Sequence, residues 1–425
     1  MYTIVYRDNR RNAVMKGMRS IFTWTLQTAE SINKFRIEKT TSLLLIALLL
    51  ATGLLFLPFA LSDQSSTSFG TLGAINYGGG STRPLHVDGK WIKDDLGNVV
   101  HLYGADRGGF NNDPYGRWEA QGETYQGGRG NFRPTAVRYQ FGVMQSTWSF
   151  NAMRWTFPIQ WWAQNTSGFR LWLTQAIMIA SEYGIYIIIV PYSVVAGTSA
   201  DAMAFPPYAS HTGASNIIPD ENAFVDFWAS VATSLAGLNN VIFDLWNEPN
   251  SGNQPVNQAK ADWQRVWQRC IDAIRAVSNN LILVQWGYGT GPNENMDWIT
   301  QYAVTGTNLV YSTHMYSTSM GYAYSPTATY EELNATFQRN GVHQVSRTLP
   351  LIWGEVGAVS SESVFLQNLL RLLNDLDIVG YLAWIWAPGP DAPVYYGLLQ
   401  NTGYVPAPNY IGQIVLDAVA AAPRD

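Results

Sequence analysis

Two glutamates stand where apolar runs of the chain stop, and their placement suits acid/base and nucleophilic chemistry. Glu248 lies in the run FDLWNEPN, and Glu355 closes the run LIWGE. Because a proline disfavours the right-handed helical region for the residue before it, Pro249 predicts an extended conformation for Glu248. Either glutamate alone could be a solvated loop carboxylate or a helix cap. Together, at the ends of two separate strands, they predict a facing pair.

A facing pair of carboxyl groups is what the hydrolysis of a glycosidic bond requires. In retaining enzymes the two groups lie about 5–5.5 Å apart, and in inverting enzymes about 6.5–9.5 Å apart. One carboxyl protonates the leaving oxygen while the other attacks the anomeric carbon. An ionised neighbour also helps the acid to keep its proton. The pair therefore predicts glycoside hydrolysis.

Short apolar runs alternate with longer helical patterns along the chain. Eight runs are predicted strands: Val99–Gly104, Asn151–Thr156, Ile185–Val190, Val241–Leu245, Leu281–Gln285, Leu309–Thr313, Pro350–Trp353 and Gly380–Ile385. Stretches with helical spacing lie between or after them: Gly168–Tyr183, Glu221–Ala236, Gln258–Val277, Ser361–Leu376 and Tyr410–Ala421.

This alternation predicts an α/β fold with a parallel sheet, and eight units close most economically into a (β/α)8 TIM barrel. An open doubly wound sheet is the alternative, but no Gly-rich phosphate loop follows an early strand. In a barrel, the polar residues that follow the strands belong to the active-site face. Before the first strand, Leu85–Tyr103 has two turn signals and predicts a hairpin. Residues 110–148, rich in Gly, Gln, Tyr and Trp, are interpreted as a long loop that shapes the cleft.

The N-terminal part has the organisation of a membrane anchor. Residues 1–42 form a basic segment, with eight Lys/Arg against three Asp/Glu, and residues 43–61 are an uncharged apolar run of 19 residues. A run of this length predicts a transmembrane or signal-anchor helix with the N-terminus in the cytoplasm. Residues 62–82, rich in Ser, Thr and Gly, predict a tether, and residues 83–425 the catalytic barrel. We expect display on the extracellular face of the membrane, or secretion if the segment is cleaved.

Composition excludes several other classes of protein. A net charge of −5 and the lack of a basic stripe argue against a nucleic-acid partner. The single cysteine, Cys270, lies in an apolar helical stripe and is predicted to be a buried structural thiol. The chain has 17 Trp and 23 Tyr, and such rings either fill the core or stack on sugars. We expect a monomer.

The motifs together resemble glycoside hydrolase family 5, the cellulase-type members of the retaining TIM-barrel clan. The resemblance rests on Asn-Glu-Pro at the fourth strand, His-x-Tyr at the sixth and a glutamate at the seventh. It covers roughly Leu85–Ala421, and the opening HVDGKWIKDDLGNVVHLYGAD also resembles the first hairpin and strand of the family. It implies that Glu248 is the general acid/base and Glu355 the nucleophile.

The resemblance also implies a set of substrate-binding residues. Asn247 matches the asparagine that binds the sugar 2-hydroxyl, and Arg154 matches the arginine that supports the nucleophile and keeps it ionised. His314 and Tyr316 match the strand-six pair, with Tyr316 donating to Glu355. Alternatively, Arg154 forms a structural ion pair with a buried carboxylate, and His314 is a histidine of the core.

The aromatic assignments have alternatives as well. Trp386 matches the platform beneath the sugar, with Trp384 as the alternative. Trp286, Trp161 and Trp162 follow strands and either line the substrate groove or pack in the core.

One motif departs from the family pattern. After the third strand the chain has Pro-Tyr-Ser, where many members carry Asp-x-His with a histidine that touches the sugar. Tyr192 or Ser193 is the substitute here, which leaves the sugar preference open.

The resulting function is retaining, endo-acting hydrolysis of β-1,4-glucan without a metal or other cofactor. One alternative keeps the mechanism and changes the polysaccharide to mannan, xyloglucan or another β-glycan. A second is a non-catalytic, membrane-displayed barrel that only binds polysaccharide.

Overall fold

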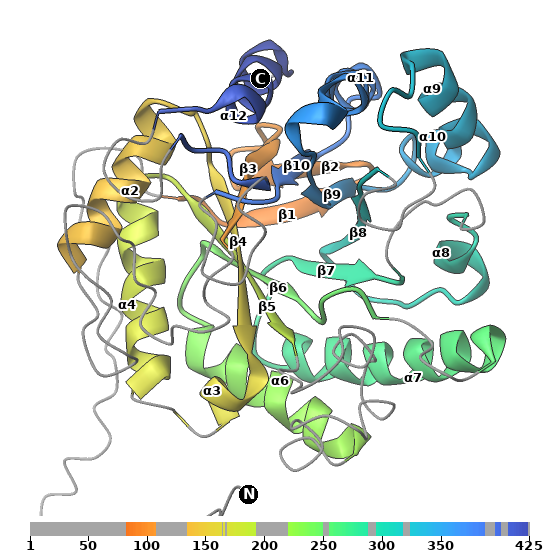
Figure 1. Ribbon diagram of the computed structural model, residues 1–425. Helices are drawn as coiled ribbons and strands as arrows, with labels where there is room; N and C mark the ends of the chain where they lie inside the picture. Colours follow the sequence, from red (N-terminus) through yellow and green to blue (C-terminus); the bar gives the residue numbers. More distant parts are fainter. Residues whose placement is uncertain are drawn as a thin grey trace, which may run out of the picture. The chain divides into compact units, whose positions relative to one another are not determined.

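Eight parallel strands close into a barrel with the neighbour order β10-β3-β4-β5-β6-β7-β8-β9 (Figure 1). In chain order they are β3 (Leu102–Arg107), β4 (Ala152–Pro158), β5 (Tyr186–Tyr192), β6 (Val241–Asp244), β7 (Ile282–Gln285), β8 (Leu309–Met315), β9 (Leu351–Val356) and β10 (Gly380–Ala383). The computed structural model describes residues 82–107, 134–163, 165, 168–192, 220–249, 255–287, 295–317, 324–386, 396–400 and 407–423. The predicted (β/α)8 barrel and all eight predicted strands are confirmed.

Helices surround the barrel and cover its outer face (Figure 1). In the described residues they are α2 (Pro134–Ser146), α3 (Ile159–Ala163), α4 (Phe169–Glu182), α6 (Glu221–Leu235), α7 (Val256–Arg275), α8 (Trp298–Gln301), α9 (Tyr330–Arg339), α10 (Val342–Val345), α11 (Ser363–Asp375) and α12 (Tyr410–Ala421), with a 3-10 turn at Ser360–Glu362. Because both faces of the sheet are covered, the strands are apolar runs without alternation. All residues of β3, β6, β8 and β9 are buried.

A two-stranded hairpin fills the amino end of the barrel. Strands β1 (Leu85–Asp88) and β2 (Trp91–Asp94) pair antiparallel, as predicted. Their residues Leu85 and Ile92 join a buried cluster with side chains from the barrel strands, among them Leu102, Ile188 and Leu283. Since this end is packed with apolar side chains, the polar site has to lie at the carboxyl end of the strands.

The expectation of a long loop over residues 110–148 is wrong for its second half. Pro134–Ser146 forms helix α2, which starts with a proline, a residue favoured at the first helical position. Its residues Val137, Phe141 and Met144 are buried at spacings of four and three, so α2 packs one apolar face inward. Residues 108–133 lie outside the described part of the chain.

The predicted membrane segment, residues 43–61, lies outside the described residues, as does the tether except Thr82. Within the described ranges, the structure has no helix that is both long and apolar enough to cross a membrane. The proposed anchor therefore stays a prediction.

Replacing Gly104 in β3 with alanine is expected to destabilise the barrel severely. A Cβ atom at this position would lie 1.8 Å from the carbonyl oxygen of Ala152, which is backbone of the paired strand β4. We expect Gly104→Ala to lower the free energy of unfolding by about 3 kcal/mol or more, measured by urea denaturation. Gly237→Ala is the matched control, because a Cβ there meets nothing within 4 Å. Equal stability of the two variants would contradict the close approach of β3 and β4.

Candidate active site

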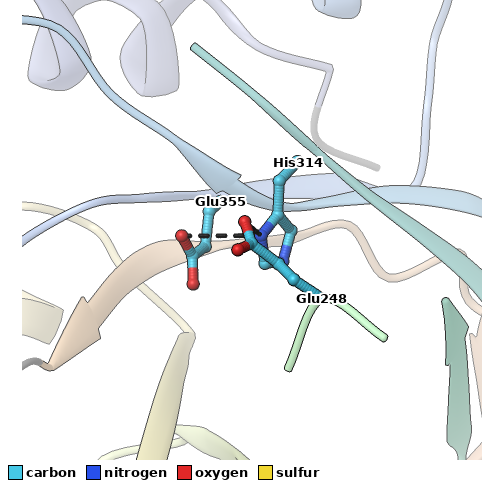
Figure 2. A group of neighbouring side chains, drawn as sticks. All are labelled: Glu248, His314 and Glu355. Atoms are coloured by element: carbon cyan, nitrogen blue, oxygen red, sulfur yellow. Dashed lines mark hydrogen bonds and ion pairs between the residues drawn. The ribbon is translucent and has the colours of Figure 1, made fainter. Parts of the chain in front are cut away.

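The two glutamates singled out from the sequence converge at the carboxyl end of the barrel. Figure 2 shows Glu248, which follows β6, beside Glu355 of β9 and His314 of β8. One carboxylate oxygen of each glutamate and one ring nitrogen of His314 lie within 4.8 Å of one another. Glu248 and Glu355 are only 6% and 5% exposed. The two carboxyl groups thus approach each other closely in a buried site.

Arg154 organises the inner part of the site. It is fully buried on β4, and Nη1 donates to Glu355 Oε1 at 2.7 Å and to Asp106 Oδ1 at 2.9 Å. Nε donates to Asp244 Oδ2 at 2.9 Å, and Nη2 donates to Asn247 Oδ1 at 2.8 Å. Burial disfavours the charge of Arg154, but Asp244, Asp106 and Glu355 outweigh it and hold the pKa of the guanidinium well above its usual value. Arg154 is therefore a permanent cation beside Glu355.

Tyr316 holds the other oxygen of Glu355. Its hydroxyl donates to Glu355 Oε2 at 2.6 Å, which is the contact expected from the sequence. Both oxygens of Glu355 thus accept a short hydrogen bond, one of them from a cation. Hydrogen bonds of this kind favour the ionised form of a carboxyl group.

His314 contacts both glutamates as an uncharged ring. Its Nδ1 lies 2.7 Å from Glu248 Oε1 and 3.5 Å from Glu355 Oε2. Burial lowers the pKa of His314 to about 3, with Glu355 opposing the shift and Arg154 adding to it. A neutral ring can donate one hydrogen bond from Nδ1 without bringing a second cation to the site.

The backbone of Glu248 differs from the extended conformation that Pro249 predicted. Its φ is 49°, in the left-handed region that residues other than glycine rarely adopt. Its N–H donates to Gln285 Oε1 at 3.4 Å, and the carbonyl of Pro249 accepts from Gly287 at 2.7 Å. Contacts with the end of β7 thus hold Glu248 in a conformation that the proline rule alone does not predict.

The tryptophans after β10 lie in different surroundings. Trp386 is 1% exposed, its ring packs against Trp148 and Phe150, and its indole N–H donates to Gln140 of α2. Trp384 is partly exposed. Of the two tryptophans named from the sequence, Trp384 is thus the more exposed.

The remaining aromatic residues named from the sequence are buried, partly buried or outside the described part of the structure. Trp286 is largely buried and packs edge-on against Trp263. Trp162 is buried beneath the guanidinium of Arg170, while Trp161 is partly buried against Phe169. Tyr192 ends β5, and its side chain, like Ser193, lies outside the described part of the structure.

Three polar residues of the site were missed by the sequence reasoning. Asp106 and Asp244 bind Arg154, and Gln285 binds the backbone of Glu248. All three are buried polar residues at or near the carboxyl end of a strand. A polar residue inside an otherwise apolar strand was the signal that could have identified them.

The cluster of Glu248, His314 and Glu355 also has the spacing of a potential metal site. However, the oxygens of Glu355 already accept from Arg154 and Tyr316, and Glu248 Oε1 is bonded to His314. A bound cation would have to displace these donors and lie close to the guanidinium. The donors present fit an anionic nucleophile better than a metal ligand, and metal-free chemistry stays a prediction.

Comparison with protein families supports the interpretation of this geometry. Residues 132–389 match the family model for cellulase, glycosyl hydrolase family 5. The chain belongs to glycosyl hydrolase family 5. The resemblance inferred from the motifs is therefore confirmed, and the protein is a glycoside hydrolase.

Solved structures of similar fold include other glycoside hydrolases. A β-glucanase from Saccharophagus degradans, solved in complex with cellotetraose, has a TM-score of 0.59 at 15% identity, covering 80% of this chain and 94% of that chain. The catalytic domain of Thermobifida fusca endoglucanase Cel5A has a TM-score of 0.55 at 19% identity, with coverage of 79% and 97%. The endocellulase of the archaeon Pyrococcus horikoshii has a TM-score of 0.57 at 16% identity, with coverage of 80% and 99%. At these identities the similarity shows a shared fold.

In the family 5 enzyme, His314 is expected to remain neutral in acid. Because its folded-state pKa is lowered to about 3, its ring should not titrate between about pH 7 and 4.5, whereas an ordinary imidazole titrates near pH 6.5. In the unfolded chain the same ring does bind a proton in this pH range. His314 therefore lowers the free energy of unfolding as the pH falls from about 6.5 towards 3. Histidine-selective NMR would measure the titration, with His314→Gln to assign the signal among five histidines. A midpoint near pH 6.5 would contradict the neutral ring.

Proposed function

We propose that this enzyme hydrolyses β-1,4-glucan internally, with retention of configuration and through a glycosyl-enzyme. The observation that carries the proposal is the pair of carboxylates, whose oxygens approach within 4.8 Å at the mouth of the barrel. Such a close approach favours direct attack by one carboxylate, because an inverting enzyme holds its carboxyl groups about 6.5–9.5 Å apart to admit a water between them.

The surroundings of the two glutamates support different roles. Glu355 accepts from Arg154 and Tyr316, which favours a carboxylate and hence a nucleophile. Glu248 faces the charge of Glu355, which favours a carboxyl that keeps its proton, and its neighbour His314 is uncharged and brings no opposing cation. In the first step an oxygen of Glu355 bonds to the anomeric carbon as the bond to the leaving oxygen breaks. Glu248 gives its proton to that oxygen.

In the second step water replaces Glu355 at the anomeric carbon. Glu248, now a carboxylate, takes a proton from the water, and the bond between Glu355 and the sugar breaks. Two inversions give net retention. His314 Nδ1 lies within hydrogen-bond distance of Glu248 Oε1 and can orient the carboxyl group whose proton moves in both steps.

Asn247 and Trp384 are the proposed sugar-binding residues. Arg154 can only donate, so its contact orients the amide oxygen of Asn247 inward and leaves the NH2 group for the 2-hydroxyl of the sugar. Trp384 is partly exposed just after β10 and packs beside Tyr316, so we assign the platform to it instead of the buried Trp386. Tyr192 and Trp286 remain proposed contacts along the groove.

The preference for β-1,4-glucan draws support from the family and from the Saccharophagus degradans β-glucanase, which was solved with cellotetraose. Mannan, xyloglucan and other β-glycans differ in hydroxyl orientation or branching, and the same two carboxylates would act on them. Among the described residues, no feature favours a protein that only binds polysaccharide. Binding alone does not need the hydrogen bonds that Arg154 and Tyr316 donate to Glu355.

The whole chain is expected to release reducing ends from carboxymethyl-cellulose. Glu355→Gln should lower kcat on the order of 10³-fold or more, because an amide cannot form the glycosyl-enzyme. Glu331→Gln, an exposed glutamate of α9, is the control and should retain full activity. Mannan, xyloglucan and barley glucan run in parallel, and faster release from one of them would change the substrate but not the mechanism. Full activity of Glu355→Gln would overturn the assignment.

The stereochemistry of the first product separates retention from inversion. Proton NMR during early hydrolysis should show the β-anomer first. Glu248→Ala should still cleave substrates whose leaving group needs no protonation, and added azide should restore its turnover by replacing water. An α-anomer as the first product would contradict the proposed mechanism.

We also propose that the barrel works outside the cell, attached through residues 43–61. The apolar run and the basic residues before it support this topology. In intact cells, external protease should degrade the barrel, and the full-length protein should fractionate with membranes. Protection from protease until the cells are lysed would contradict export, and recovery of a shortened chain from the medium would indicate cleavage.

A further inference from the structure

One buried cation in the active site faces three carboxyl groups. Arg154 binds Asp106 of β3, Asp244 of β6 and Glu355 of β9, and all four residues are buried. If all three acids were ionised, the cluster would hold two uncompensated negative charges away from water. Uncompensated buried charge is costly, so such clusters take up protons. The question is which carboxyl group holds the proton.

The hydrogen bonds distinguish Glu355 from the two aspartates. Both oxygens of Glu355 accept a donor, from Arg154 and from Tyr316. Each aspartate has one oxygen on Arg154, whereas Asp106 Oδ2 and Asp244 Oδ1 are buried with no hydrogen-bond partner among the described residues. A bare buried carboxylate oxygen is more costly than a neutral hydroxyl in the same place. Placing the proton on an aspartate therefore costs less free energy than placing it on Glu355.

We propose that Asp106 and Asp244 are proton-holding positioning residues, of which at least one is a neutral acid in the working enzyme. A neutral aspartic acid still offers its carbonyl oxygen to Arg154 and keeps the guanidinium in place. The charge of Arg154 then balances Glu355 alone. This inference rests on the proposed role of Glu355 as the nucleophile.

The electrostatics of the cluster agree with this arrangement. Burial raises the pKa of Asp106 well above its usual value, and Glu355 and Asp244 add to the shift while Arg154 opposes it. Burial likewise raises the pKa of Asp244 to about 6 against the attraction of Arg154. Glu248, Tyr316 and His314 also lie beside Glu355, and of these the ring of His314 is uncharged. After β10, the backbone N–H of Trp386 donates to the backbone carbonyl of Asp106.

Protonation of the aspartates would protect the nucleophile in acid. As the pH falls, both aspartates take up protons above the usual range of an aspartate, Asp244 near pH 6. The cluster then consists of the ion pair between Arg154 and Glu355 with two neutral acids. Because the aspartates bind protons more tightly in the folded protein than in the unfolded chain, Asp244 contributes stability in acid that is lost as the pH rises through about 6.

Carboxyl-selective 13C NMR of the full-length enzyme tests the protonation directly. With aspartate side chains labelled, Asp106→Asn and Asp244→Asn assign the two resonances. We expect both signals to move with midpoints above the usual range of an aspartate, that of Asp244 near 6. Two ionised aspartates at about pH 5 would overturn the proposal. This readout does not depend on catalysis, so it stands apart from the activity of Glu355→Gln.

Paired substitutions test the functional consequence. Asp106→Asn keeps a neutral acceptor for Arg154, whereas Asp106→Ala removes it. If the neutral form is the working one, the asparagine variant should retain at least about 10-fold more kcat than the alanine variant at about pH 5, a difference of about 1.4 kcal/mol. Asp244→Asn and Asp244→Ala form a second pair, and equal losses within both pairs would mean that both charges are required, which overturns the proposal. Asp226→Asn, on the exposed face of α6, is the control, and circular dichroism verifies that each variant is folded.

Discussion

The buried positive charge of Arg154 is the interaction on which the active site depends. Its guanidinium is cut off from water, so the protein must supply acceptors for it, and these come from Asp106, Asp244, Asn247 and Glu355. They lie on or directly after three strands of the barrel, and Arg154 itself is on a fourth. Removing one partner of a buried ion pair typically costs about 3–5 kcal/mol, because it leaves a charge uncompensated. The same contacts that hold the strands together therefore hold Glu355 in place with a cation beside it.

The two ends of the barrel have different roles: apolar packing stabilises the amino end, and the polar residues of the site lie at the carboxyl end. At the amino end the β1–β2 hairpin places Leu85 and Ile92 among apolar side chains. At the carboxyl end the polar groups compensate one another, and Glu248 is held at a φ of 49°. The buried, paired strands next to this position stabilise the strained backbone. The neutral His314 then links the two glutamates without adding charge.

Residue type and periodicity accounted for most of the fold. The eight strands were predictable because both faces of a parallel sheet are buried and each strand is a short apolar run. Helix α2 was not, because the Gly- and Gln-rich composition around it obscured the spacing of Val137, Phe141 and Met144. The backbone of Glu248 was predicted wrongly, because the rule for residues before proline does not include the hydrogen bonds that Gln285 and Gly287 provide from β7.

The sequence by itself determined the barrel, the family and the two glutamates, since apolar runs that end in carboxylates are a local property of the chain. Only the tertiary structure decided how the carboxyl groups share one cation. Asp106 and Asp244 lie 138 positions apart in a chain of 425 residues, and no local pattern joins them to Arg154. The tertiary structure also distinguished Trp384 from Trp386 by their exposure, because α2 and Trp148 cover the ring of Trp386. Burial, charge balance and exposure arise from contacts between distant segments, so they appear only when the barrel is closed.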